Sequence, residues 1–167
     1  MLSQVIIRAA TDHDIESIQS IYAYHVLNGL GTFEEVPPTI IEMKSRLHNI
    51  QLLNYLFLVA EIKQQVVGYC YTNYYRQRSA YRYMVEDSIF VAHNYQGQKI
   101  GQILLTELIK QSKQQKFSQM IAVIGDSNNM GSINLHKKLG FAITGKLNKA
   151  GFKFNQWVDV VLMQLEL

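Results

Sequence analysis

The sequence predicts a single domain of the α/β class, of the mixed α+β kind, with helices on the faces of a mixed sheet. Periodic apolar patterns give the order β-α-α-β-β-β-α-β-α-β-β, which is neither regular βαβ alternation nor all-β. The chain has 167 residues, 48% of them hydrophobic, which is enough for one sizeable core. No repeat, low-complexity segment or linker interrupts it, so residues 1–167 are expected to form one domain.

The first third is expected to hold one strand and two helices. Residues 5–9 read as a strand, and Thr11 or Asp12 is suited to cap the helix that follows and ends near Gly29 and Gly31. The residues that share the buried face of this helix are Ile15, Ile18, Ile21, Tyr22 and His25. After a polar loop at 32–38, Thr39 caps a second helix. Its apolar stripe is Ile40, Met43 and Leu47.

The middle third reads mainly as strands. Residues 55–62 and 66–74 are separated only by Lys63-Gln64-Gln65, so they are expected to pair as an antiparallel hairpin. Residues 76–80 form a polar crossing, and residues 81–91 read as a long strand.

This strand leads into a glycine-bearing loop at 92–98 and then a helix. The apolar stripe of that helix is expected to be Ile100, Ile103, Leu104, Leu108 and Ile109. Gly97 and Gly101 allow the backbone to approach a ligand, and a helix N-terminus presents unpaired N–H groups that suit a pyrophosphate. An ordinary βα turn is the simpler interpretation of the same pattern.

The last third is expected to contain a strand at 119–124, a short helix at 129–139, and closing strands at 141–147 and 157–165. Asn129 is a suitable N-cap, and Gly140 is suited to a left-handed C-cap.

Composition and missing motifs exclude several classes of function. No Gly-Lys-Ser/Thr follows the central glycines and no G-x-G-x-x-G follows the first strand, which disfavours nucleotide hydrolysis and dinucleotide redox chemistry. The net charge of +3 is scattered, so a nucleic-acid partner is not expected. The longest apolar run, residues 55–60, cannot cross a bilayer, and the N-terminal run closed by Arg8 is too short for a signal peptide. Cys70 is the single cysteine, expected to be a buried free thiol in a cytoplasmic protein without a metal.

Two motifs resemble those of the GNAT acetyltransferase superfamily. Residues Gln96 to Gly101 resemble the Gln/Arg-x-x-Gly-x-Gly/Ala signature that wraps the pyrophosphate of acetyl-CoA, with Lys99 in place of the middle glycine. The spacing Asn129-x-x-Ser132-x-x-x-His136-x-x-x-Gly140 matches the fourth motif of that superfamily, apart from one extra residue between Gly125 and Asn129. The resemblance implies a GNAT fold, with a central mixed, mostly antiparallel sheet flanked by helices, and acetyl-CoA as cosubstrate.

Three further blocks resemble the phosphinothricin and methionine sulfoximine acetyltransferases. They are Thr32-Phe33-Glu34, Arg78-Ser79-Ala80-Tyr81 with Val85-Glu86, and Ala150-Gly151-Phe152-Lys153 with Trp157-Val158-Asp159. The resemblance implies an N-acetyltransferase that moves the acetyl group to the α-amine of a small amino-acid analogue by direct attack. It also implies a homodimer.

The resemblance assigns roles to individual residues. An α-ammonium must lose a proton before it attacks, and Glu86 is the expected general base. His136 stands where related enzymes carry the group that protonates the departing thiolate. The residues expected to contact acetyl-CoA are Ile89, Phe90, Val91, Gly97, Gln98, Lys99, Ile100, Gly101, Gln102, Asn129 and Ser132. The residues expected to bind the acceptor are Phe33, Arg76, Arg78, Tyr81, Asp87 and Ser88, with the guanidinium groups suited to oxyanions. A solvated strand carboxylate, a helix cap and a core-edge histidine are the structural alternatives for Glu86, Asn129 and His136.

Two other functions stay open from the sequence. The same fold acetylates other amines, such as aminoglycosides, polyamines or protein N-termini, although arginines near the expected pocket argue against polycationic acceptors. The chain could also be a non-catalytic CoA-binding domain, against which the presence of both Glu86 and His136 argues.

Overall fold

The computed structural model describes residues 4–167, so residues 1–3 of the predicted domain lie outside the described part. The helices and strands are β1 (Ile6–Ala9), α1 (Ile15–Asn28), α2 (Ile40–Leu52), β2 (Phe57–Ile62), β3 (Gln65–Tyr74), β4 (Met84–Val91), α3 (Ile100–Gln114), β5 (Gln119–Gly125), α4 (Met130–Lys138), β6 (Ala142–Lys153) and β7 (Gln156–Glu166). Short 3₁₀ turns are η1 (Asp12–Asp14), η2 (Ser79–Tyr81) and η3 (His93–Tyr95).

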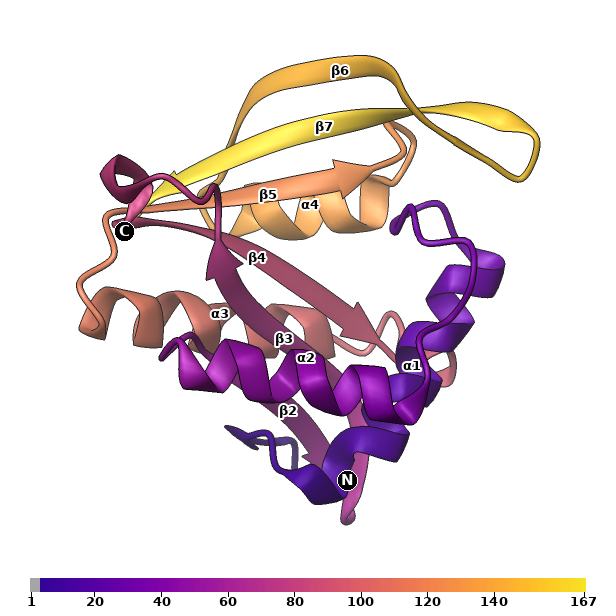
Figure 1. The fold of residues 1–167 in the computed structure, drawn as a ribbon, viewed down its shortest axis with the longest axis vertical. Helices are drawn as coiled ribbons and strands as arrows, with labels where there is room; N and C mark the ends of the chain where they lie inside the picture. Colours follow the sequence, from indigo (N-terminus) through magenta and orange to yellow (C-terminus); the bar gives the residue numbers. More distant parts are fainter. Residues whose placement is uncertain (1–3) are drawn as a thin grey trace.

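The strands form one seven-stranded sheet in the order β1-β2-β3-β4-β5-β7-β6 (Figure 1). Of its described strand pairs, β4 and β5 are parallel and the others are antiparallel. This architecture confirms the predicted mixed, mostly antiparallel sheet with flanking helices.

Two apolar clusters cover the two faces of the sheet. One joins α1 and α2 to β2 and β3, with Ile18, Leu47 and Tyr69 at its centre. The other joins α3 and α4 to the opposite face, with Leu104 and Ile133 among its members. Since side chains alternate along a strand, consecutive residues of β4 reach different clusters.

Strands β4 and β5 stay paired over only half of β4. Their register runs from Met84 opposite Gln119 to Asp87 opposite Ala122 and goes no further. Beyond that point β5 continues to pair with β7 and β4 with β3, and the two parallel strands diverge toward α1 (Figure 1). The sheet therefore opens next to Asp87, and the β5-facing backbone groups of residues 88–91 lack a strand partner.

The buried stripe of α3 differs from the prediction at one position. Ile103 is 39% exposed, whereas the unpredicted Leu105 is fully buried. Ile100, Leu104, Leu105 and Leu108 are the apolar residues that the helix directs at the sheet. Ile103 lies outside that arc, because helical neighbours are rotated by about 100° per residue.

Several strand bounds also differ from the prediction. The strand expected from residue 81 begins at Met84, because Ser79–Tyr81 forms a 3₁₀ turn. The strand expected at 141–147 continues to Lys153, and the strand expected at 157–165 already begins at Gln156. Their pairing shifts register between Ile143 and Gly145 and again between Leu147 and Gly151, so alternation of apolar and polar residues is lost there.

Several local predictions are confirmed. Thr39 caps α2 and Asn129 caps α4, each accepting a hydrogen bond from a backbone N–H three residues on. Gly140 has φ +97°, as a left-handed C-cap requires. Cys70 is a free, buried thiol. Within residues 4–167, the helices are all too short or too polar to span a bilayer.

Candidate active site

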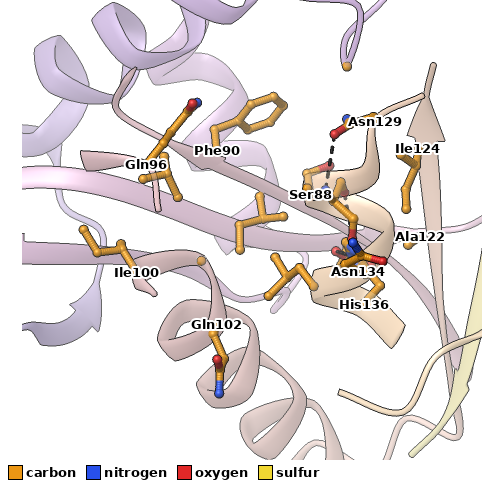
Figure 2. A pocket seen from close by; sticks show the side chains of 18 of the residues that line it. Ser88, Phe90, Gln96, Ile100, Gln102, Ala122, Ile124, Asn129, Asn134 and His136 are labelled. Atoms are coloured by element: carbon orange, nitrogen blue, oxygen red, sulfur yellow. Dashed lines mark hydrogen bonds and ion pairs between the residues drawn. The ribbon is translucent and has the colours of Figure 1, made fainter. Parts of the chain in front are cut away.

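A cleft of about 690 Å³ occupies the place where β4 and β5 separate. The second half of β4, the start of α3, the end of β5 and one face of α4 form its walls (Figure 2). In Figure 2 Phe90, Ile100, Ile124 and His136 surround the same hollow, each from a different element. Nearly every residue expected to contact acetyl-CoA lines it: Ile89, Phe90, Val91, Gly97, Lys99, Ile100, Gly101, Gln102, Asn129 and Ser132. The exception is Gln98, whose side chain donates to the Asn94 carbonyl 3.2 Å away.

The loop before α3 has the backbone of a glycine-rich anion site. Gly97 has φ +75° and Lys99, at the N-cap of α3, has φ +64°. Lysine rarely adopts this left-handed conformation, which costs a residue with a Cβ about 1–2 kcal/mol. The position where the GNAT signature has a glycine therefore keeps the glycine-like backbone and adds an ammonium group to the cleft.

The free edge of β4 forms another wall, and α1 contributes to it through His25. His25 lines the cleft, and its Nε2 lies 2.8 Å from the carbonyl oxygen of Val91. Since a carbonyl only accepts, this nitrogen carries the proton. Burial lowers the pKa of His25, so the ring is neutral near pH 7. The sequence indicated the helical face of His25 but not its contact with the site.

His136 and Asp87 form a buried pair at the point where the strands separate. The exposed fractions of their side chains are 2% and 1%, and His136 Nε2 lies 3.0 Å from Asp87 Oδ2. On the other side of the ring, Nδ1 lies 2.8 Å from the Ser132 carbonyl oxygen. Burial disfavours the imidazolium, but the hydrogen bond and the charge of Asp87 outweigh it and raise the pKa of His136.

Glu86 precedes Asp87 in β4 and therefore lies on the opposite face of the sheet. It is directly opposite Asn73 of β3, on the side covered by α1 and α2. Burial, together with the negative charge of Asp87, raises the pKa of Glu86 to about 7. A carboxylate tuned in this way can take a proton near neutral pH. Glu86 and His136 thus lie on opposite faces of the sheet, and Asp87, at the end of the paired half of β4, is next to both.

The chain is similar to known proteins along nearly its whole length. The family profile described as Acetyltransferase (GNAT) domain matches residues 7–162. The chain belongs to the GNAT acetyltransferases.

Two curated relatives and one solved structure extend this similarity. The phosphinothricin N-acetyltransferase of Alcaligenes faecalis is 43% identical over 161 residues, which cover 96% of this chain and 82% of that protein. The L-methionine sulfoximine/L-methionine sulfone acetyltransferase of Salmonella typhimurium (strain LT2) is 35% identical over 164 residues, which cover 96% of this chain and 94% of that protein. The crystal structure of a GNAT superfamily phosphinothricin acetyltransferase from Sinorhizobium meliloti, in complex with AcCoA, is 41% identical with a TM-score of 0.95. It covers 98% of this chain and 88% of that one.

GNAT acetyltransferases take the acetyl group from acetyl-CoA, and the cleft suits this cosubstrate. A loop with left-handed residues at 97 and 99, followed by a helix N-terminus, offers backbone N–H groups to a diphosphate. The unpaired edge of β4 offers further backbone groups to an amide-bearing chain. No group of three His, Cys, Asp or Glu side chains in residues 4–167 is arranged to hold a metal ion.

The residues predicted to bind the acceptor divide into two groups in this GNAT chain. Asp87 and Ser88 line the cleft. Phe33, Arg76, Arg78 and Tyr81 do not: all four are exposed and lie in the α1–α2 loop or between β3 and β4. The ring of Phe33 packs against Gly151, where a Cβ would come within 2.4 Å of it. The side chain of Arg78 donates only to the neighbouring Gln77 carbonyl in the described chain.

Lys153 fixes the loop that carries Phe33. It is 2% exposed, and its ammonium donates to the carbonyl oxygens of Gly29 and Thr32, both at 2.8 Å. The Phe154 ring lies 4.9 Å from the same nitrogen. Burial lowers the pKa of Lys153. The β6–β7 hairpin is therefore fastened to the α1–α2 loop. Gly31 of that loop lines the cleft.

The sequence missed several residues that line the cleft. They are His25, Gly31, Tyr95, Gln96, Ala122, Val123, Ile124, Gly125, Gly131, Asn134, Leu135 and Lys138. Gln96 begins the GNAT signature and could have been assigned from it. The end of β5 gave no polar signal, because it contributes through its backbone and small side chains. Gly125 lies so close to the Leu30 carbonyl oxygen that a Cβ would come within 2.4 Å of it.

Proposed function

We propose that this enzyme moves the acetyl group of acetyl-CoA to the α-amine of a small amino-acid analogue of the phosphinothricin or methionine sulfoximine type. The names of the relatives support the substrate class. One observation supports the mechanism: a carboxyl group of raised pKa and a buried histidine lie on opposite faces of the sheet, both next to Asp87, where the sheet opens into a cleft that suits acetyl-CoA.

The binding of acetyl-CoA is assigned to the residues that line this cleft. Gly97 and residues 99–102 would hold the diphosphate with backbone N–H groups and the Lys99 ammonium. The free edge from Ile89 to Val91 would hold the pantetheine amides, while Asn129 and Ser132 would contact it from the start of α4. Bound there, acetyl-CoA supplies a thioester as the acetyl donor.

The chain's own groups would then perform three tasks. Glu86 removes a proton from the acceptor's ammonium group, directly or through a water, so that the amine can attack. Backbone N–H groups at the opened edge of β4 stabilise the carbonyl oxygen of the thioester. His136, held as a cation, favours departure of the sulfur through its charge, since its two ring nitrogens face Asp87 and Ser132. Glu86 and His136 approach from different faces of the sheet, which suits a direct transfer between amine and thioester.

The acceptor is assigned to the side of the sheet where Glu86 lies. Phe33 would form one wall and Ser88 the floor, while Arg76 and Arg78 would attract the carboxylate and the phosphinate or sulfoximine oxygens. Tyr81 packs against Tyr75, whose ring also carries the Arg76 guanidinium at 5.1 Å. This segment bears arginines, which disfavours polycationic acceptors.

We also propose a homodimer that uses the β6–β7 hairpin, in a protein of the cytoplasm. Phe152, Phe154 and Trp157 are each at least half exposed on that hairpin. Exposed aromatic side chains on an edge hairpin are typical of a surface that pairs with another chain. The cytoplasmic location rests on the sequence, with its one unpaired cysteine.

Thiol release tests the proposed function. Purified protein is mixed with acetyl-CoA and one acceptor at a time: methionine sulfoximine, phosphinothricin, an aminoglycoside, a polyamine or a peptide with a free N-terminus. We expect free CoA with the first two. If CoA is released only with the last three acceptors, the proposed substrate class is wrong. If acetyl-CoA binds tightly but no amine releases CoA, the chain is a non-catalytic domain.

A further inference from the structure

The hydrogen-bond partners of His136 favour its cationic form. Nε2 faces the Asp87 carboxylate and Nδ1 faces the Ser132 carbonyl, and both of these groups are acceptors. A neutral imidazole has one N–H, so one of its nitrogens would direct a lone pair at an acceptor. When Asp87 is ionised, these two short contacts are both satisfied only if both nitrogens carry protons, since the Ser132 hydroxyl lies farther from Nδ1, at 3.4 Å.

The negative charge of Asp87 in turn depends on His136. Its Oδ2 accepts from His136, while its Oδ1 is buried and has no hydrogen-bond partner in the described chain. A buried carboxylate without compensation is costly, so the imidazolium is the group that stabilises its charge. Loss of the proton from His136 would leave Asp87 buried and unneutralised.

The same carboxylate also acts on the other face of the sheet. Glu86 is its neighbour in β4, and the negative charge of Asp87 disfavours ionisation of Glu86. One carboxylate therefore favours the proton on two groups, the imidazole on its own face and the carboxyl group behind it.

We propose that Asp87 is a positioning residue of the acetyl-transfer site, which holds His136 as an imidazolium and sets the pH range over which Glu86 and His136 act together. Asp87 need not bind the acceptor for this role. The inference rests on the proposed function, since it concerns the pH range of acetyl transfer.

Other charged groups near the pair are few. Cys70 of β3 lies on the same face, and its thiol faces the Leu104 carbonyl. The side chains of the cleft wall that can carry a positive charge are His25, Lys99 and Lys138. The residue of β5 opposite Asp87 is Ala122, which has no charge. Within the cleft wall, residues 100–102 of α3 carry no titratable side chain. On the other face, Arg76 acts on Glu86 in the opposite sense to Asp87.

The substitution Asp87→Asn, which keeps the shape of the side chain, tests the proposal. We expect both limbs of the pH profile of kcat/KM to move toward acid, since His136 and Glu86 both lose the influence that favours their protons. The limb that reports His136 should move by about one pH unit or more. A merely structural role would lower the rate at every pH without moving the limbs.

The matched control is Asp12→Asn. Asp12 also pairs with a histidine, His48, at 2.6 Å, but this pair lies on the exposed surface. The control should leave both limbs in place. If Asp87→Asn leaves them in place as well, the proposal is wrong.

Nitrogen NMR of the histidine rings gives a second readout that needs no turnover. The chain has five histidines, and a His136→Gln variant assigns the signal of His136. In the unsubstituted protein we expect both ring nitrogens of His136 to be protonated at pH 7, and a neutral ring would overturn the proposal even if Asp87→Asn fails to fold. If no amine is acetylated, the proposed function fails while this measurement still decides the role of Asp87.

Discussion

At the scale of single residues, the site combines groups whose properties depend on neighbours distant in the sequence. Glu86 could be identified from its motif, but its raised pKa comes from burial and from Asp87. The contact between Asp87 and His136 joins residues 49 positions apart, and nothing in the spacing indicated it. The sequence therefore predicted which residues line the cleft better than it predicted their charge states.

Glu86→Gln should reduce kcat by about 100- to 10,000-fold, because the general base is lost. Acetyl-CoA affinity, measured by calorimetry, should change little, since Glu86 lies outside the cleft wall. Glu166→Gln, an exposed carboxylate at the end of β7, is the control. Unchanged turnover in Glu86→Gln would contradict the role as base.

The same substitution should change stability in one pH range. Folding raises the pKa of Glu86 from 4.5 to about 7, so folding favours its protonated form. The contribution is present below pH 4.5 and is lost as the pH rises through 7. Glu86→Gln should therefore be more stable than the parent protein at pH 8 and about equal at pH 4.5, measured by urea unfolding. A constant difference across this range would argue against the raised pKa.

Lys99→Gly should separate the backbone role of Lys99 from its charge. Glycine relieves the left-handed conformation, so we expect a gain in stability of up to about 1 kcal/mol. Acetyl-CoA binding should weaken and depend less on salt, because one cation is lost. Lys99→Ala loses the same charge but keeps the strain, and should show only the second effect. Equal stability of the two variants would contradict the strain argument.

At the scale of elements, the helices and the caps of α2 and α4 were predicted closely, because short-range sequence patterns determine them. The cap predicted for α1 was wrong: its N-cap is Asp14 rather than Thr11 or Asp12, since residues 12–14 form a 3₁₀ turn. The β6–β7 hairpin was predicted too short, because two register shifts interrupt its alternation and its turn uses Phe154 and Asn155, both with positive φ. The separation of β4 from β5 also has no local signature. It results from how two strands pair with other neighbours, which only the three-dimensional arrangement reveals.

Lys153→Met should loosen the connection between the hairpin and the α1–α2 loop. Two carbonyls, of Gly29 and Thr32, lose their donor, which should reduce stability by about 1–3 kcal/mol. The KM for the acceptor should rise, since Phe33 lies in the released loop, while acetyl-CoA affinity stays nearly constant. Lys146→Met, which removes an exposed lysine from the same hairpin, is the control. Equal changes in both affinities would contradict a role confined to the acceptor side.

At the scale of the whole molecule, the proposed binding regions for donor and acceptor lie on opposite faces of the sheet and would meet only where it opens. The acetyl donor is assigned to the side of α3 and α4, and the acceptor to the side of α1 and α2. The hairpin at the far edge of the sheet packs against the loop that carries Phe33, and it also carries the exposed aromatic residues. Assembly and acceptor binding are thus expected to be connected.

A double substitution of Phe152 and Trp157 by serine should convert the proposed dimer into a monomer. These side chains are 51% and 61% exposed in the single chain, so their loss should cost the fold little. Sedimentation velocity measures the change, and Ile41→Ser, at an 83% exposed position on α2, is the control. A parent protein that sediments as a monomer would remove the dimer from the proposal.

The interrupted pairing between β4 and β5 has one more consequence, which concerns exchange of amide hydrogens with solvent. Amides of residues 88–91 that point toward β5 have no carbonyl across the gap, so deuterium should replace their hydrogens quickly in the free enzyme. Amides of residues 84–87, inside the paired half, should be protected. Adding acetyl-CoA should slow the first group and leave the second unchanged, which would make one half of a single strand a reporter of donor occupancy.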